Sequence, residues 1–139
     1  SNANSVMVSD KNLNIIKRAM EKVSLDEFGT GRNFRLGIKG VEMAGKTGTV
    51  QVRRISTKER ESEEGVIKNE DRIWEWRDHA LYVGYAPMDK PRYSISVIVE
   101  HGGSGSSKAG PIARDIMEAT LTDDPTRFIP KNPIKKPLI

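Results

Sequence analysis

Apolar residues along the chain follow two different periods, which separate predicted helices from predicted strands. Near the N-terminus they recur at helical spacing after Asp10, a residue type that caps helices, and form the face Leu13, Ile16, Met20 and Val23. We expect this helix to pack on the core. A second helix begins with Pro111 in its first turn and ends at Leu121, and its semi-apolar face holds Ile112, Ile116, Ala119 and Thr120.

Three segments between these helices have the alternation or the β-branched content of strands. The first runs on from Lys46 to Val52, and the second covers residues 79–86. The third covers residues 92–100, and its more buried face is predicted to hold Tyr93, Ile95, Val97 and Val99. The short turn between the last two strands implies an antiparallel pair. The sequence thus predicts an α+β fold, a three-stranded antiparallel sheet covered on one face by the N- and C-terminal helices.

Between the first two strands, residues 56–78 hold 13 charged residues in 23, too many to bury, and form a predicted charged insertion. Trp74 and Trp76 lie at its far end, where packing on one side of the incoming strand is favoured over an exposed contact patch. Residues 1–3 are interpreted as an expression scar and residues 4–121 as part of one domain. Four prolines make residues 122–139 a Pro-rich tail.

The overall charge of +4 does not identify a nucleic-acid binder, because the insertion alone carries −3 and no Lys/Arg cluster has interleaved aromatics. We therefore expect no nucleic-acid partner. The absence of cysteine excludes disulfides and thiol catalysis, and no apolar run reaches about 20 residues. Only two histidines occur, His79 and His101, without further ligand spacing, so we expect structural roles at strand ends, no metal site and no cofactor.

The candidate chemistry is concentrated in the stretch from Met43 to Val52. From Gly40 to Thr47 the letters match Gly-x-x-x-x-Gly-Lys-Thr, the phosphate-binding P-loop, which requires a helix after the lysine. Glycine and β-branched residues follow instead, and they disfavour a helix. A Lys-Thr-Gly strand, as in penicillin-interacting serine enzymes, is therefore favoured, with a P-loop nucleotide-binding protein as the alternative.

Taken in their order along the chain, the predicted elements and motifs resemble the C-terminal part of a penicillin-binding protein transpeptidase domain. The resemblance is closest to elongation-type penicillin-binding protein 2. The resemblance runs from about Asp10 to Leu121, and residues 44–52, 77–87 and 99–105 carry it. It implies a β-lactamase/transpeptidase-like fold and a D,D-transpeptidase that cross-links peptidoglycan stem peptides by serine acyl transfer. A β-lactam-sensing receptor domain is the alternative, and the charged insertion with Arg77-Asp78-His79 favours the enzyme.

The resemblance also implies roles for residues of the first strand. Lys46 would supply positive charge to the serine network and the carboxylate pocket. The hydroxyls of Thr47 and Thr49 would bind the substrate carboxylate, and the Thr49 backbone N–H would form half of the oxyanion hole. Gly48 would leave room for the substrate. No Ser-x-x-Lys or Ser-x-Asn motif occurs in the chain, so we expect the nucleophile upstream in a longer parent protein and an inactive fragment.

By the same resemblance, the ligands of the parent are peptidoglycan stem peptides and β-lactams. Its partners are the glycan polymerase and scaffold proteins of the elongation complex, and it is anchored in the bacterial inner membrane on the periplasmic face. In this fold an upstream strand would pair with residues 92–100. Without that strand, residues 92–100 would form an unpaired edge of the sheet, so we expect the fragment to dimerise. Arg32 and Arg35 are predicted to be solvated, and the glycine run 102–110 is either a mobile cleft rim or a flexible connection.

Overall fold

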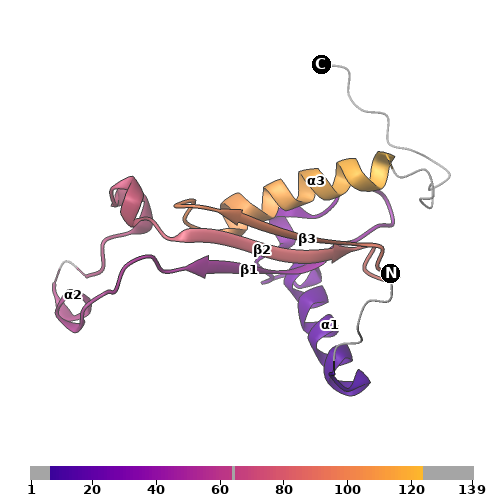
Figure 1. Cartoon of the computed structure of the whole chain (residues 1–139), viewed down its shortest axis with the longest axis horizontal. Coiled ribbons are helices and arrows are strands. Elements are labelled where there is room, and N and C mark those ends of the chain that lie inside the picture. The colour runs from indigo at the N-terminus through magenta and orange to yellow at the C-terminus, as the bar shows by residue number, and fades with distance from the viewer. Residues whose placement is uncertain (1–6, 64, 124–139) are drawn as a thin grey trace, which may run out of the picture.

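The computed structural model describes residues 7–63 and 65–123; the predicted scar and residues 124–139 of the predicted tail lie outside it. Within these described residues the fold has three helices and three strands: α1 (Asp10–Leu25), β1 (Ala44–Val50), α2 (Thr57–Glu61), β2 (His79–Ala86), β3 (Tyr93–Val99) and α3 (Gly110–Asp123). Four short turns complete it: η1 (Arg32–Phe34), η2 (Asn69–Asp71), η3 (Trp74–Trp76) and the π-helical η4 (Gly105–Ala109). The predicted α+β class is confirmed (Figure 1).

The sheet is an antiparallel meander in the order β1-β2-β3, as predicted. Thr47 of β1 lies opposite Tyr82 of β2, which in turn lies opposite Val97 of β3. The second strand has the predicted bounds, whereas β1 begins two residues before Lys46 and ends at Val50. In β3, partly buried and exposed residues alternate as predicted.

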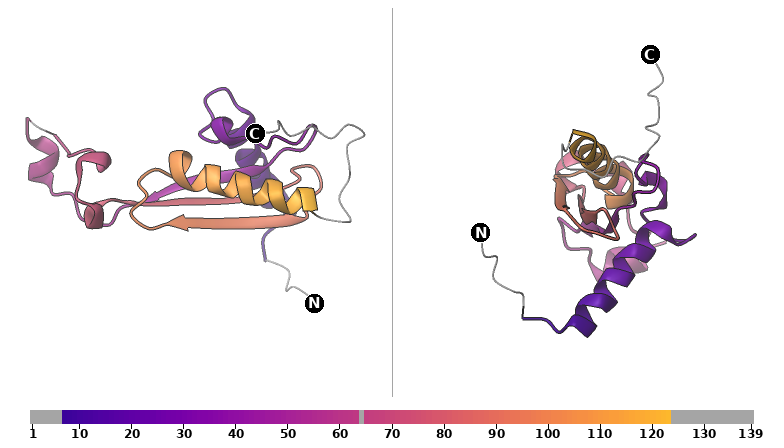
Figure 2. Two further views of the ribbon diagram at one scale, coloured as in Figure 1. Left: turned by 90° about the horizontal axis from the view of Figure 1, so that it is seen from above. Right: turned by 90° about the vertical axis from the view of Figure 1, so that its right-hand side faces the viewer.

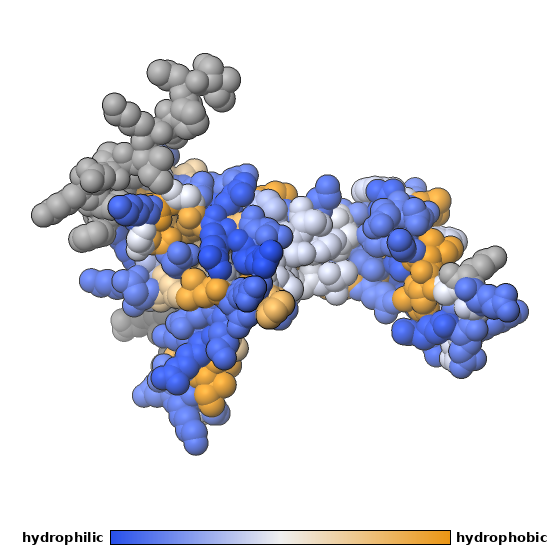
Figure 3. All heavy atoms as spheres, turned by 180° about the vertical axis from the view of Figure 1, so that it is seen from behind, coloured by the Kyte–Doolittle hydropathy of each residue, from blue (hydrophilic) through white to orange (hydrophobic). Residues whose placement is uncertain are grey.

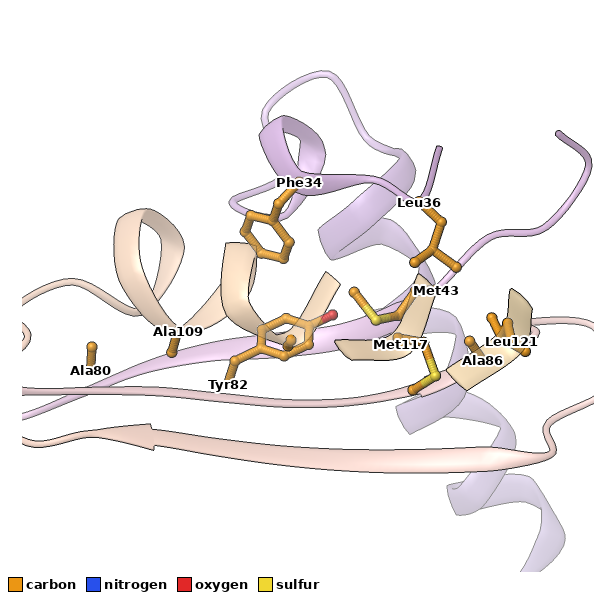
Figure 4. Packing of buried hydrophobic residues seen from close by; sticks show 10 residues of the cluster. Phe34, Leu36, Met43, Ala80, Tyr82, Ala86, Ala109, Met117 and Leu121 are labelled. Atoms are coloured by element: carbon orange, nitrogen blue, oxygen red, sulfur yellow. The ribbon is translucent and has the colours of Figure 1, made fainter. Parts of the chain in front are cut away.

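The core lies on the face of the sheet that α3 covers (Figures 2 and 4). Tyr82 is its centre: the side chain is fully buried, and the Phe34 ring meets it edge-on with centroids 5.2 Å apart. The other buried residues are Leu36, Met43, Ala80, Ala86, Ala109, Ala113, Met117 and Leu121. Small side chains in β2 and at the start of α3 let the helix approach the sheet closely.

The predicted apolar face of α3 is wrong by one position. Ala113, Met117 and Leu121 are buried, whereas Ile112 and Ile116 are exposed. The π-helical turn η4 precedes the helix, and Gly110 packs against the Phe34 ring, so the buried face of α3 continues from Gly110 through Ala113 and Met117. The helix also continues to Asp123, two residues past its predicted end.

The expectation that α1 packs on the core holds only for its last turns. Leu13 and Ile16 are exposed, Met20 and Val23 are partly buried, and Ser24 is buried. The helix touches the sheet near β1 and projects away from it, whereas α3 lies along the sheet (Figures 1 and 2). The capping residue is Ser9 rather than Asp10, because the Ser9 hydroxyl accepts a hydrogen bond from the Asn12 N–H at 3.4 Å.

Residues 56–78 form an excursion that extends beyond the sheet, as predicted (Figure 1). Its two tryptophans do not pack in the core, so that prediction is wrong: Trp74 is 57% exposed and Trp76 is 53% exposed. They lie in η3, not on an incoming strand, and Figure 3 shows apolar side chains at the surface of this part of the chain. The Trp76 ring lies 5.8 Å from the guanidinium of Arg53, which also forms an ion pair with Glu59.

Burial of Tyr82 predicts a pH dependence of stability. Desolvation raises the pKa of its hydroxyl to about 12, above the value of about 10 expected in the unfolded chain. The unfolded state therefore loses this proton first, and the stability that the neutral hydroxyl contributes is lost as the pH rises from about 10 to about 12. Urea unfolding at about pH 9 and about pH 11.5 measures this loss of the free energy of unfolding. Tyr82→Phe should lose stability less steeply than the unmodified protein, and Tyr85→Phe, at a tyrosine that is only partly buried, should differ less. Equal pH dependence of the unmodified protein and Tyr82→Phe would contradict this.

The outer edge of β3 generates a second prediction, because within residues 7–63 and 65–123 it pairs with β2 alone. We expect this 139-residue chain to self-associate through that edge, and light scattering at high concentration should report a dimer. Ile98 is 63% exposed on this strand, and Ile98→Lys should shift the mass toward the monomer. Ile116→Lys, at an exposed position of α3, is the matched control and should leave the dimer intact. A monomeric unmodified chain at high concentration would show that the edge does not pair.

Candidate functional site

The residues singled out from the sequence lie together on β1, but on two faces of it. Because side chains alternate along a strand, Lys46 and Gly48 lie on the face opposite α3, whereas Thr47 and Thr49 lie on the face of Tyr82. Lys46 is exposed, and its Nζ donates a hydrogen bond to the Thr47 carbonyl oxygen at 2.7 Å. The strand therefore presents a cation on one side and two hydroxyls on the other.

The geometry contradicts the P-loop alternative. A P-loop lysine lies at the N-terminus of a helix, where backbone N–H groups converge on a phosphate. Lys46 instead lies in the middle of β1, and the next helix, α2, begins only at Thr57. The Lys-Thr-Gly strand predicted from the β-branched run is the observed structure.

Thr47 has a partner that the sequence did not reveal. Its Oγ1 lies 3.0 Å from Oγ1 of Thr30, which belongs to the glycine-flanked segment before η1. A cavity of about 550 Å³ lies beside Thr30, and its lining includes Phe28, Arg32, Ser106 and Ser107. No local pattern marks Thr30, because the contact joins residues 17 positions apart. A pair of hydroxyls can be extended by a further acceptor, so the arrangement suits a polar ligand at this edge.

Arg32 and Arg35 are exposed, as predicted, but both have fixed partners. Arg32 donates from Nη1 to the Glu27 carbonyl oxygen at 2.6 Å. Arg35 donates to the carbonyl oxygens of Ser24 and Leu25 at 2.7 and 2.9 Å. These are carbonyls that the end of α1 leaves without helical partners, so Arg35 joins α1 to the segment that leads into β1.

The glycine run after β3 packs directly on β1. Gly105 lies so close to the strand that a Cβ there would overlap the carbonyl oxygens of Gly48 and Leu81. A Cβ on Gly48 would lie 3.3 Å from the Leu81 side chain. The second half of this run, residues 105–109, forms η4 and contacts β1 and β2, which favours the cleft rim over the connection. The run forms part of the border of β1.

Both histidines lie at strand ends, His79 at the start of β2 and His101 just after β3. The His101 N–H donates to Nδ1 of His79 at 2.9 Å. Beside them, Arg72 forms an ion pair with Asp78, both Nη1–O distances being 3.2 Å, and Arg72 is buried. Among the described residues, no group of three or more His, Cys, Asp or Glu side chains is placed to hold a metal ion.

Comparison with known proteins shows the family to which the chain belongs. The model of the penicillin binding protein transpeptidase domain matches residues 1–118. The chain belongs to this family. The peptidoglycan D,D-transpeptidase MrdA of Haemophilus influenzae is 38% identical over 105 residues, 76% of this chain, and that of Acinetobacter baumannii is 36% identical over 120 residues, 86% of this chain. The chain spans only 15% and 16% of the lengths of these two relatives.

Solved transpeptidases have the same fold. The penicillin-binding protein PBP2 of Pseudomonas aeruginosa, in complex with WCK 5153, superposes with a TM-score of 0.62 at 29% identity, over 91% of this chain and 23% of that one. PBP2 of Helicobacter pylori, in complex with MreC, gives the same TM-score at 30% identity, over 81% and 17%. The sequence-based resemblance and its β-lactamase/transpeptidase-like fold are confirmed.

The close packing of Gly105 on β1 predicts a sensitive position. Gly105→Ala places a methyl group against two backbone carbonyls, which cannot rotate away, so we expect a loss of about 2 kcal/mol or more in the free energy of unfolding. Lys108→Ala, at an exposed position of the same turn, is the control and should change stability by less than about 0.5 kcal/mol. Urea denaturation measures both. Equal stability of Gly105→Ala and the unmodified chain would show that η4 does not pack on Gly48.

Proposed function

We propose that this chain is the C-terminal, substrate-binding part of a longer peptidoglycan D,D-transpeptidase. One observation carries the proposal: the strand Lys46–Thr49 lies at the edge of the sheet in a chain of the transpeptidase family, with the lysine exposed and both threonines outside the core. A peptide substrate can add to such an edge as a further strand.

In the proposed reaction a serine supplied by the rest of the parent attacks the D-alanyl carbonyl, the peptide C–N bond breaks, and the terminal residue leaves as an amine that takes up a proton. An amine of a second stem peptide then displaces the serine oxygen, which forms the cross-link and frees the serine. Lys46 supplies positive charge to the serine network and, from the face of β1 opposite the two hydroxyls, acts on the substrate carboxylate through its charge rather than by direct contact. The hydroxyls of Thr47 and Thr49 donate hydrogen bonds to that carboxylate. The Thr49 backbone N–H is one of the two donors that stabilise the oxyanion, and Gly48 keeps the strand narrow beside the substrate.

The lack of Ser-x-x-Lys and Ser-x-Asn motifs supports the further proposal that this chain alone is inactive. The β-lactam-sensing receptor has less support, because the two curated relatives reported above are both named transpeptidases. The longer parent would bind stem peptides and β-lactams.

The partners of the parent are proposed from the relatives. The structure of the Helicobacter pylori relative with MreC supports a scaffold protein of the elongation complex as one partner, with its glycan polymerase as another. We place the parent in the bacterial inner membrane, facing the periplasm, as is usual for cell-wall synthesis. No helix in the described part of this chain is long and apolar enough to cross a membrane.

Labelling with a fluorescent penicillin tests the proposal. The full-length parent should be acylated, and Lys46→Ala should slow acylation by about a hundredfold or more, because it removes a charge that favours the reacting state. Lys39→Ala, which removes an exposed lysine before β1, is the matched control and should label at the unmodified rate. The 139-residue chain should not label. Undiminished labelling of a folded Lys46→Ala parent would contradict the catalytic role proposed for Lys46. Labelling of the 139-residue chain would show that the nucleophile lies within it.

A further inference from the structure

Two histidines connect the end of the excursion to the loop that follows β3. The rings of His79 and His101 lie with centroids 4.7 Å apart, at 70° to each other. The backbone N–H of His101 donates to Nδ1 of His79 at 2.9 Å, a bond that we call the histidine latch. Because Nδ1 of His79 accepts in this bond, its ring must carry its proton on Nε2. The neutral form of His79 is therefore the one that fits this structure.

The second ring has a different constraint. Nδ1 of His101 lies 3.0 Å from the carbonyl oxygen of Arg77, and a carbonyl can only accept, so Nδ1 of His101 is the donor. This bond can form in both the neutral and the protonated ring. His101 has a positive φ of 54°, and the Trp74 ring packs against it with centroids 4.3 Å apart. Only His79 must therefore stay neutral for the observed contacts.

His101, the donor of the latch, lies four residues before Gly105, where the glycine run contacts β1. Gly103 follows His101 and donates from its N–H to the Asp78 carbonyl oxygen at 2.8 Å. Gly105 then packs on the backbone of Gly48. The path from His79 to β1 is thus a short, hydrogen-bonded segment. Loss of the first bond should loosen the segment and, with it, the support of Gly48 and Thr49.

The charged groups near His79 have other partners or are exposed. Asp78 is the adjacent carboxylate, but it is already paired with buried Arg72 and accepts from the Val52 N–H at 3.3 Å. Arg77 brings a further positive charge, held by the carbonyl oxygens of Arg72 and Glu70. Val50, opposite His79 in the sheet, carries no charge, and Glu100 is exposed. A proton added to Nδ1 would also meet the His101 N–H, so two donors would face each other.

We propose that His79 is a positioning residue that holds residues 101–105 against β1 only while its imidazole is neutral. Histidine is the side chain that ordinarily changes charge between pH 5 and 8, so acidification should release the loop. The structural part of this inference depends only on the contacts above. Its effect on acylation rests on the proposed function, in which β1 binds the substrate.

Hydrogen exchange of the full-length parent tests the structural part. Amide exchange rates at residues 48–50 and 101–105, corrected for the intrinsic effect of pH, should be about tenfold higher at pH 5 than at pH 8, as expected for the loss of one hydrogen bond. His79→Asn should abolish this difference, because its Oδ1 occupies the place of the histidine Nδ1, can accept from the His101 N–H and does not titrate. His79→Phe should exchange rapidly at both pH values, because it has no acceptor.

His101→Asn is the matched control. Asparagine tolerates a positive φ and keeps the backbone N–H, so the latch and its pH dependence should persist although one of the two histidines is gone. Unchanged protection of the unmodified protein between pH 8 and pH 5 would overturn the proposal. So would a pH dependence that survives in His79→Asn, or one that disappears in His101→Asn.

Fluorescent-penicillin acylation separates this inference from the proposed function. The acylation rate of the unmodified parent should fall on acidification from pH 8 to pH 5, and that of His79→Asn should fall less. If the exchange results follow the latch but the folded parent is never acylated, the latch stands and the proposed function fails. If the parent is acylated with the same pH profile in both proteins, the proposed effect of the latch on acylation is wrong.

Discussion

The packing of Tyr82 across Gly45 is the contact on which the rest of the structure depends. Gly45 has no side chain, and a Cβ there would overlap the tyrosine hydroxyl and ring. The Phe34 ring covers Tyr82 from the η1 segment, and Gly110 gives Phe34 room at the start of α3. Two glycines and two aromatic rings therefore join β1, β2, η1 and α3 in one continuous contact.

This contact fixes only the first half of β1. Gly45 is buried beneath Tyr82, but Thr49 and Val50 are exposed, and the sheet alone supports them from the side of β2. The second support comes from Gly105, which packs on Gly48. The strand is thus held on both sides of Lys46 and Thr47 by glycines that allow close approach. A site that binds a charged group benefits from such rigidity, because its donors need not be reorganised when the charge arrives.

The fold class, the strand order and the nature of the Lys46 segment could be predicted from the sequence, because period-two alternation and β-branched residues act locally. Three predictions failed for reasons that local patterns do not carry. The buried face of α3 is not evident from the sequence of the helix alone, because a π-helical turn precedes it. Trp74 and Trp76 lie two positions apart, as residues on one face of a strand do, but they belong to a 3₁₀ turn. The exposed face of α1 has an ordinary helical pattern, and no rule of periodicity says whether a partner covers it.

The candidate site shows the same division between local and long-range information. Lys46, Thr47 and Thr49 were found because they adjoin one another in a motif. Thr30 was not found, because it meets Thr47 only through the fold. The sequence predicts structural roles at strand ends for the two histidines, and the bond between them shows what such a role can include. A bond that needs one protonation state makes the support of Gly48 depend on pH, while the Tyr82 contact at the other end of β1 titrates only far into the alkaline range, with a pKa of about 12. The two supports of the strand should therefore respond to acid differently, and only the one beside Thr49 should weaken.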